Sequence, residues 1–224
     1  LAAAAYETDA GVYGLPTGRE DYVVLRPDAG RRKAAGESYF AEPAAGVIWN
    51  EAENRWPASA PAMRPAVERY YAGLERLTAR LLEAFGRGLA NGGRPRRPRA
   101  TAAPAAAAHP AAAVARRWRS DHCSNLVLGF HDERVAAGGG ALKVDAHSDT
   151  GLLTVLSYGS AGPVGLEIKT GSGWQPIAVD RWPGQRALLV NVGDALALLS
   201  GGVLKDTPHR VRETAAAGAV QPAR

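Results

Sequence analysis

The sequence predicts a mainly β fold, an antiparallel barrel or sandwich braced by one long helix. After Trp118, short segments rich in Val, Leu, Ile and aromatic residues recur between Gly, Pro, Ser and Asp residues. Closely spaced strands have this pattern. A single stretch that begins at Pro65 repeats apolar residues at steps of three and four, which is typical of an amphipathic helix. One apolar stripe on a helix is buried most simply against the outer face of a sheet.

The length and composition fit one sizeable domain. The chain has 224 residues, of which 46% are hydrophobic, enough to build a proper core. Its one cysteine, Cys123, excludes an intrachain disulfide and a cysteine-based zinc site. No uninterrupted apolar run approaches the roughly 18 residues of a membrane span, so we expect a cytoplasmic protein. The chain begins with Leu, and organellar targeting therefore stays open.

The positive charge alone could suggest a nucleic-acid partner, because the formal net charge is +5 and the pI is about 9.6. Its location argues against this. Many arginines gather around one low-complexity stretch that has no interleaved aromatic residues; they are Arg94, Arg96, Arg97, Arg99, Arg116, Arg117 and Arg119. We therefore expect no nucleic-acid partner, and the lack of a long apolar run predicts no membrane partner either. The sequence gives no indication of the oligomeric state.

Residues 1–90 are predicted to form an N-terminal region of short strands and loops that ends in the long helix. Residues 1–63 are rich in Gly and Pro. The helix is expected over residues 65–86, with Pro65 in its first turn. Gly86, Gly88 and the following Asn-Gly-Gly are expected to end it.

Residues 91–117 are predicted to be a disordered insertion. From residue 94 they are almost wholly Ala, Pro and Arg. Such a segment cannot bury enough apolar surface to offset its ordering entropy. His109 lies inside it and is expected to be a solvated loop residue.

Residues 118–224 are predicted to form the β core, with an end that is possibly truncated. Five strand-like segments follow one another: SNLVLGF, LLTVLSY, GLEIKT, WQPIAV and RALLVNVG. Within the last of them, we expect residues 191–193 to form a turn after the ALLV strand. Asp194 is expected to cap or pin that turn rather than to do chemistry.

One His and one Asp, two positions apart, raise the possibility of a metal site. On an extended strand His147 and Asp149 would point to the same side. His209 could join them if the two segments lie on neighbouring strands. Two imidazoles and one carboxylate form the facial arrangement of non-haem Fe(II) oxygenases, which leaves positions open for cosubstrate and O2. Taken alone, a His-x-Asp pair is more often a chance occurrence in a loop than a pair of ligands. A single histidine such as His209 is more often an ordinary strand residue. His122 and His131 are not expected to be ligands.

Several longer segments give these residues a family context. They are HSDTGLLTVL, GLEIKTGSGWQPIAV, ALLVNVGDALALLSGG, TPHRV, RPAVERYYAGLERLTARLLEAFGRGL and ESYFAEPAAGVIWNEAENRWP. In order and spacing they resemble the 2-oxoglutarate and Fe(II)-dependent dioxygenases of the isopenicillin N synthase-like superfamily. The resemblance covers roughly residues 33–90 and 118–212, on either side of the insertion.

The resemblance implies a double-stranded β-helix, or jelly roll, with Fe(II) bound by His147, Asp149 and His209. It also implies 2-oxoglutarate as cosubstrate, which chelates the iron and is oxidatively decarboxylated by O2 to succinate and CO2. A small organic metabolite would be hydroxylated, desaturated or cyclised in the same reaction. Imidazole and carboxylate ligands suit Fe(II), and no thiolate is needed.

The family's cosubstrate arginine is harder to place. An Arg-x-Ser pair usually follows the distal histidine by about ten residues, and its planar guanidinium meets the far carboxylate of 2-oxoglutarate. Here position 219 is Ala. A small Ala-Gly insertion would make Arg224 the arginine and place its serine beyond the sequence. Arg212 competes, but its offset from His209 should point it to the other side of a strand. A tyrosine that many members carry near SNLVLGFHDE is also missing.

Two other readings stay open. An incomplete Arg-x-Ser motif would suit an oxidase or cyclase of the same fold that does not use 2-oxoglutarate. The insertion and the abrupt end would suit a non-catalytic jelly-roll fragment, although the complete set of three ligands argues against that.

Overall fold

The computed structural model describes residues 19–28, 54–90, 113–114, 118, 122–131, 142–158, 165–177 and 187–212. The chain divides into two compact units. The first comprises Leu1–Leu77 and Trp118–Val135, and the second comprises Thr78–Arg117 and Ala136–Arg224. The long helix crosses the boundary between the two units at residue 77.

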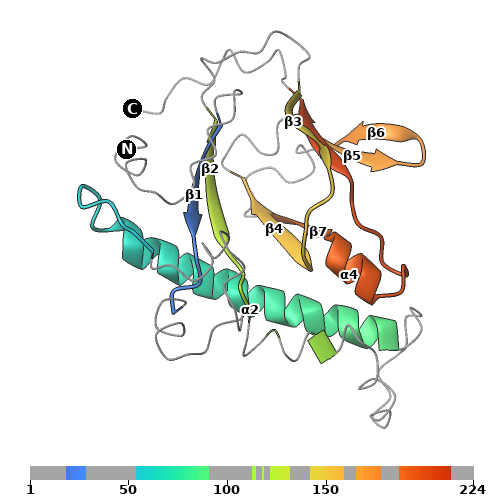
Figure 1. Ribbon diagram of the computed structural model, residues 1–224, viewed down its shortest axis with the longest axis horizontal. Helices are drawn as coiled ribbons and strands as arrows, with labels where there is room; N and C mark the ends of the chain where they lie inside the picture. The colour runs from blue at the N-terminus through green and yellow to red at the C-terminus, as the bar shows by residue number, and fades with distance from the viewer. Residues whose placement is uncertain are drawn as a thin grey trace, which may run out of the picture. The chain divides into compact units, whose positions relative to one another are not determined.

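Helix α2 runs over Met63–Ala90 (Figure 1). It contains the predicted residues 65–86, and Tyr71, Leu82 and Leu89 are its most buried apolar side chains. The helix continues past Gly86 and Gly88, contrary to the predicted bound at residue 86, and its last residue, Ala90, stands immediately before the Asn-Gly-Gly that was also predicted to end it. An isolated helical glycine costs only about 1 kcal/mol relative to alanine. Burial of Leu89 beyond the two glycines offsets that cost by a similar amount, so the helix continues for one more turn.

The first unit contains a two-stranded antiparallel sheet. Strand β1 (Arg19–Val24) pairs with β2 (Leu126–His131). Val24 is fully buried. The hydroxyl of Tyr71 on α2 donates a hydrogen bond to the carbonyl of Ser124 at 2.7 Å, which fixes the segment that leads into β2.

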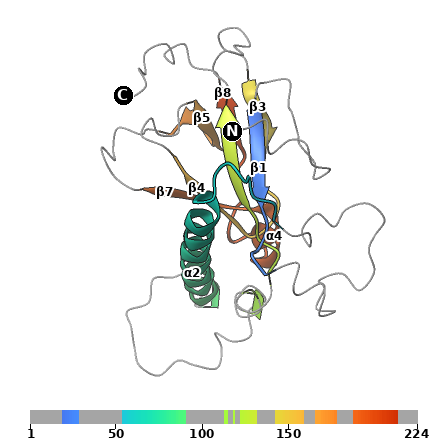
Figure 2. The ribbon, with the colours of Figure 1, turned by 90° about the vertical axis from the view of Figure 1, so that its left-hand side faces the viewer.

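The second unit contains the remaining strands in two sheets. Strands β3 (Leu142–His147), β8 (His209–Arg212), β5 (Leu166–Thr170) and β6 (Gly173–Pro176) form a four-stranded antiparallel sheet in that order. Strands β4 (Leu153–Ser157) and β7 (Leu188–Val192) form the other sheet. Both views show β3 beside β8 and β4 beside β7 (Figures 1 and 2). The mainly β class predicted from the sequence is confirmed.

Each of the five predicted strand segments overlaps an observed strand, namely β2, β4, β5, β6 and β7. The predicted turn at residues 191–193 is wrong. Asn191 and Val192 belong to β7, where they pair with Thr154 and Leu153 of β4. A short helix that the sequence did not predict, α4 (Asp194–Leu199), follows at once. Its Leu196 is only 1% exposed, and this burial anchors a helix too short to be stable alone.

Other predictions fall on residues that the structure does not describe. These residues include Ala219, Arg224, and the predicted insertion except for positions 113 and 114. Within the described part of the chain, no helix is long and apolar enough to cross a membrane.

Candidate metal centre

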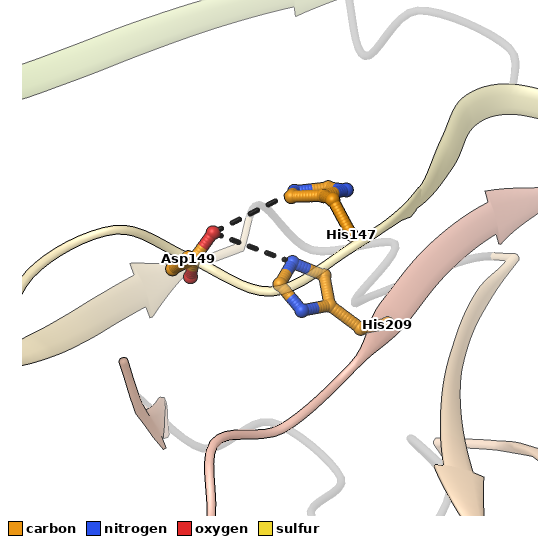
Figure 3. Close-up of side chains that lie close together, drawn as sticks. All are labelled: His147, Asp149 and His209. Carbon is orange, nitrogen blue, oxygen red and sulfur yellow. Dashed lines mark ion pairs between the residues drawn. The ribbon is translucent and has the colours of Figure 1, made fainter. Parts of the chain in front are cut away.

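Two neighbouring strands bring the two histidines together. His147 is the last residue of β3, His209 is the first of β8, and the two are partners in the antiparallel register. Their rings lie side by side, with centroids 4.3 Å apart (Figure 3). Sequence reasoning required these segments to lie on neighbouring strands, and they do.

Asp149 reaches the histidines from a loop. The prediction that His147 and Asp149 share one extended strand is wrong, because β3 ends at His147. The chain turns after β3, and the carboxylate of Asp149 points back at both rings (Figure 3). Its Oδ1 lies 3.6 Å from Nε2 of His147 and 3.6 Å from Nε2 of His209.

The three facing atoms are arranged to hold one ion. Separations of 3.6 Å are too long for hydrogen bonds, yet all three ligand atoms lie within 4.8 Å of one another. Two imidazole nitrogens and one carboxylate oxygen are a donor set that suits Fe(II). The residues present therefore fit a divalent transition-metal ion.

Backbone carbonyls fix which nitrogen of each ring faces the centre. Nδ1 of His147 lies 2.7 Å from the carbonyl of Asp145, and Nδ1 of His209 lies 2.9 Å from that of Thr207. A carbonyl can only accept, so Nδ1 of each ring carries the proton and donates. Each Nε2 then presents its lone pair to Asp149, as a metal ligand must.

The carboxylate is held in its ionised form. Asn191 Nδ2 donates to Asp149 Oδ2 at 2.7 Å. Burial raises the pKa of Asp149. Hydrogen bonds from Thr154 and Asn191 and the two nearby imidazoles outweigh burial, so this pKa lies below its ordinary value. An ionised carboxylate is the form that binds a cation.

Helix α4 holds the loop that carries Asp149. Helices begin with backbone amides that have no partner inside the helix. Here the amide of Asp194 donates to the carbonyl of Asp149 at 2.9 Å, and that of Ala195 donates to the carbonyl of Gly151 at 3.1 Å. The side chain of Asp194 accepts from the amide of Gly151 at 2.9 Å. Asp194 therefore pins the ligand loop rather than a turn after β7.

A side-chain hydrogen bond joins the two segments that carry the candidate ligands. Ser148, between His147 and Asp149, donates through its hydroxyl to Oδ2 of Asp206 at 2.7 Å. Asp206 lies three positions before His209. It is next to Thr207, whose carbonyl accepts the hydrogen bond from Nδ1 of His209. The hydrogen bond between Ser148 and Asp206 therefore links the segment that carries His147 and Asp149 to the segment that leads into His209.

Sequence reasoning missed Asn191, Ser148 and Asp206. The signal for Asn191 was one amide in the otherwise apolar strand LLVNV. A polar residue in such a strand needs a partner when it is buried. The link between Ser148 and Asp206 joins positions 58 apart in sequence, and no local pattern reports it.

The other candidate residues lie elsewhere. Arg210 and Arg212 both donate to Oε2 of Glu167 on β5, at 2.6 Å and 3.1 Å. They share one face of β8, and alternation along a strand places His209 on the other. His122 belongs to the first unit, where its ring contacts Glu75 at 2.6 Å.

The site is accessible from the side of His147. The side chain of His147 is 42% exposed, whereas those of Asp149 and His209 are 20% and 12% exposed. Of the three candidate ligands, His147 is therefore the one most open to solvent, whereas the other two are largely enclosed.

Comparison with known proteins agrees with this geometry. Residues 120–219 match the 2OG-Fe(II) oxygenase superfamily. Scopoletin 8-hydroxylase of Arabidopsis thaliana is 44% identical over 72 residues, which cover 32% of this chain and 18% of that protein. Jasmonate-induced oxygenase 4 of the same plant is 27% identical over 158 residues, 70% of this chain and 38% of that protein. The chain thus spans less than two fifths of either relative.

Solved structures show the fold. A 2OG-Fe(II) oxygenase family protein from Caulobacter crescentus superposes with a TM-score of 0.51 at 22% identity, over 88% of this chain and 52% of that chain. A full-length Neurospora crassa protein in complex with alpha-KG gives 0.51 at 20% identity, over 88% of this chain and 49% of that chain. These likenesses agree with the expected double-stranded β-helix. Residues 120–219, which contain all three candidate ligands, are thus the part of this chain that is similar to the 2OG-Fe(II) oxygenase superfamily.

Proposed function

We propose that this chain carries the iron centre of a non-haem Fe(II) and 2-oxoglutarate-dependent oxygenase, with His147, Asp149 and His209 as the metal ligands. One observation carries the proposal. Oδ1 of Asp149 faces Nε2 of both histidines at 3.6 Å, while each Nδ1 is occupied by a backbone carbonyl. The two Nε2 atoms and Oδ1 are thus already oriented toward one another as the ligands of a single ion would be.

The bound iron and 2-oxoglutarate would supply the activation of O2, with succinate and CO2 as products and oxidation of a substrate C–H bond. The chain itself holds and orients the three metal ligands. Asp149 stays ionised, both imidazoles keep the tautomer that binds metal, and the three ligands occupy one face of the ion. Small molecules would approach from the side of His147, whose side chain is the most exposed of the three.

We propose Arg224 as the partner of the far carboxylate of 2-oxoglutarate. A planar guanidinium binds a carboxylate through two parallel hydrogen bonds. Arg212, the competing candidate, already donates to Glu167 at 3.1 Å. Substitution of Arg224 with Ala should raise the KM for 2-oxoglutarate at least tenfold. The same substitution at Arg212 should change that KM less than threefold.

We propose a small organic metabolite as the substrate, oxidised by hydroxylation or desaturation. The printed names of the relatives, a scopoletin hydroxylase and a jasmonate-induced oxygenase, support this class. The Arg-rich stretch near residue 100 lacks the interleaved aromatic residues of a nucleic-acid surface, so no nucleic-acid partner is proposed. The single cysteine fits a reducing compartment, and we propose the cytoplasm.

The test is a panel of small aromatic and terpenoid metabolites, incubated with the chain, Fe(II) and 2-oxoglutarate. Succinate release should rise with the correct substrate and disappear in Asp149→Ala. The second candidate is an oxidase of the same fold that does not use 2-oxoglutarate, favoured because position 219 is Ala and Arg212 is engaged by Glu167. Substrate loss without succinate would select it.

A further inference from the structure

Asn191 is the polar residue of an apolar strand, and its side chain serves a candidate metal ligand. It lies in β7, where it pairs with Thr154 of β4. Its Nδ2 donates to Oδ2 of Asp149 at 2.7 Å. Hydrogen bonds to a charged acceptor are stronger than those between neutral groups. Together with the hydrogen bond from Thr154, this amide therefore fixes the rotation of the Asp149 carboxylate.

The carbonyl oxygen of the same amide destabilises the folded chain. Oδ1 of Asn191 is buried and has no hydrogen-bond partner among the residues that the structure describes. A buried unpaired polar atom destabilises the folded state, and an apolar side chain of similar shape would avoid that loss. Asn191 is thus poorly explained as a residue that stabilises the strand. Its contact with Asp149 explains it better.

The contact also decides which oxygen of Asp149 is available. Oδ2 is occupied by Asn191, and Oδ1 alone faces the two imidazoles. With one oxygen and two nitrogens bound, an octahedral ion keeps three open positions. A chelating 2-oxo acid needs two of them, and O2 needs the third. A carboxylate that bound through both oxygens would leave one position too few.

We propose that Asn191 is a positioning residue that keeps Asp149 a one-oxygen ligand and so preserves three open positions on the metal. This inference rests on the proposed function, because it presumes that the site binds a metal. It assigns Asn191 no contact with the ion itself. Its effect passes through the carboxylate alone.

The test uses Mn(II), which binds the same ligands and can be followed without turnover. Asn191→Leu removes the donor and keeps the volume. Its Kd for Mn(II) should rise about 10- to 100-fold, the usual loss when a partner of a metal ligand is removed. Thermal stability without metal should change little, because the loss of the donor to Asp149 and the removal of the unpaired Oδ1 oppose each other. Val190→Ala, one residue earlier and 36% exposed, is the matched control and should bind Mn(II) normally.

Water bound to the metal gives a readout that a purely structural role would not change. Proton relaxation of Mn(II)-bound water should report three waters in the native chain and fewer in Asn191→Leu. If Asn191→Leu does not fold, Asn191→Ala carries the same test. A Kd within threefold of native, or three waters in the variant, would overturn the inference. A native chain that binds no Mn(II) would instead overturn the proposed function.

Discussion

The backbone amide of Asp194 donates a hydrogen bond to the carbonyl of Asp149 at 2.9 Å, so the first turn of α4 holds the loop that carries a candidate metal ligand. The preceding residue, Gly193, lies against the same loop. A Cβ built on Gly193 would stand 2.5 Å from the carbonyl oxygen of Gly151 and 3.0 Å from that of Asp149. The close approach of α4 to the loop therefore needs a glycine here.

Gly193→Ala should push the Asp149 loop away from α4. Both contacting atoms are backbone, so neither can move cheaply. We expect a loss of about 1–3 kcal/mol in the free energy of unfolding, as for other overpacked sites. Mn(II) affinity should fall with it. Urea unfolding and calorimetry measure the two effects.

Gly88→Ala is the matched control for that substitution. Gly88 lies in α2, and a Cβ there would meet nothing within 4 Å. Alanine should therefore stabilise the chain by about 0.5–1 kcal/mol. A Gly193→Ala chain as stable as native would show that the loop has more room than the structure gives it.

The hydrogen bond between Ser148 and Asp206 should couple the two ligand segments. Ser148→Ala and Asp206→Ala should each weaken Mn(II) binding, because each releases one segment near a ligand. In a double-mutant cycle on Kd, the double variant should lose less than the sum of the two single losses, with a coupling of about 0.5–3 kcal/mol. Additive losses would mean that the two residues act separately.

Leu196 should determine whether α4 stays in place. It is 1% exposed, whereas Leu198 on the same helix is 81% exposed. Leu196→Ala should lower the free energy of unfolding by about 2–5 kcal/mol, and Leu198→Ala should change it by less than about 0.5 kcal/mol. Chemical denaturation compares them. Equal effects of the two substitutions would contradict the packing described for α4.

His122 should make the first unit sensitive to acid. Burial lowers the pKa of His122 below its ordinary 6.5, with a further lowering by Arg26, and the contacts with Glu75 and Asp28 only partly oppose this. The amide of Ser124 donates to Nδ1 at 3.3 Å, an interaction that requires an unprotonated Nδ1. The folded chain therefore prefers the neutral ring.

The sign of the pH effect follows from that preference. The unfolded chain takes up the proton more readily, so the stability from neutral His122 is complete above pH 6.5. It falls as the pH drops below 6.5 toward the lower pKa of the folded state. Urea midpoints at about pH 7.5 and pH 5.5 should differ more in the native chain than in His122→Gln. The same difference in both chains would refute this role.

Much of the fold was readable from the sequence because its signals are local. The strands β4, β5 and β7 are short apolar runs between turn residues, and α2 has a regular apolar stripe. The end of α2 was misjudged because burial of Leu89 outweighs two glycines. Helix α4 was missed because a helix of six residues has almost no periodicity, and tertiary burial of Leu196 stabilises it instead.

The sequence predicted which residues form the candidate site, but not how the fold brings them together. His147, Asp149 and His209 follow from spacing and resemblance. The loop position of Asp149 does not, because it depends on contacts with Gly193 and Asp194 more than forty residues away. Arg224 stays a prediction.

The central claim is that His147, Asp149 and His209 bind iron together with 2-oxoglutarate. The most direct measurement is the visible absorption of the chain after anaerobic addition of Fe(II) and 2-oxoglutarate. The native chain should develop a weak charge-transfer band that is absent from His209→Ala and retained in Leu198→Ala. A band of unchanged intensity in His209→Ala would contradict the assignment of the metal centre.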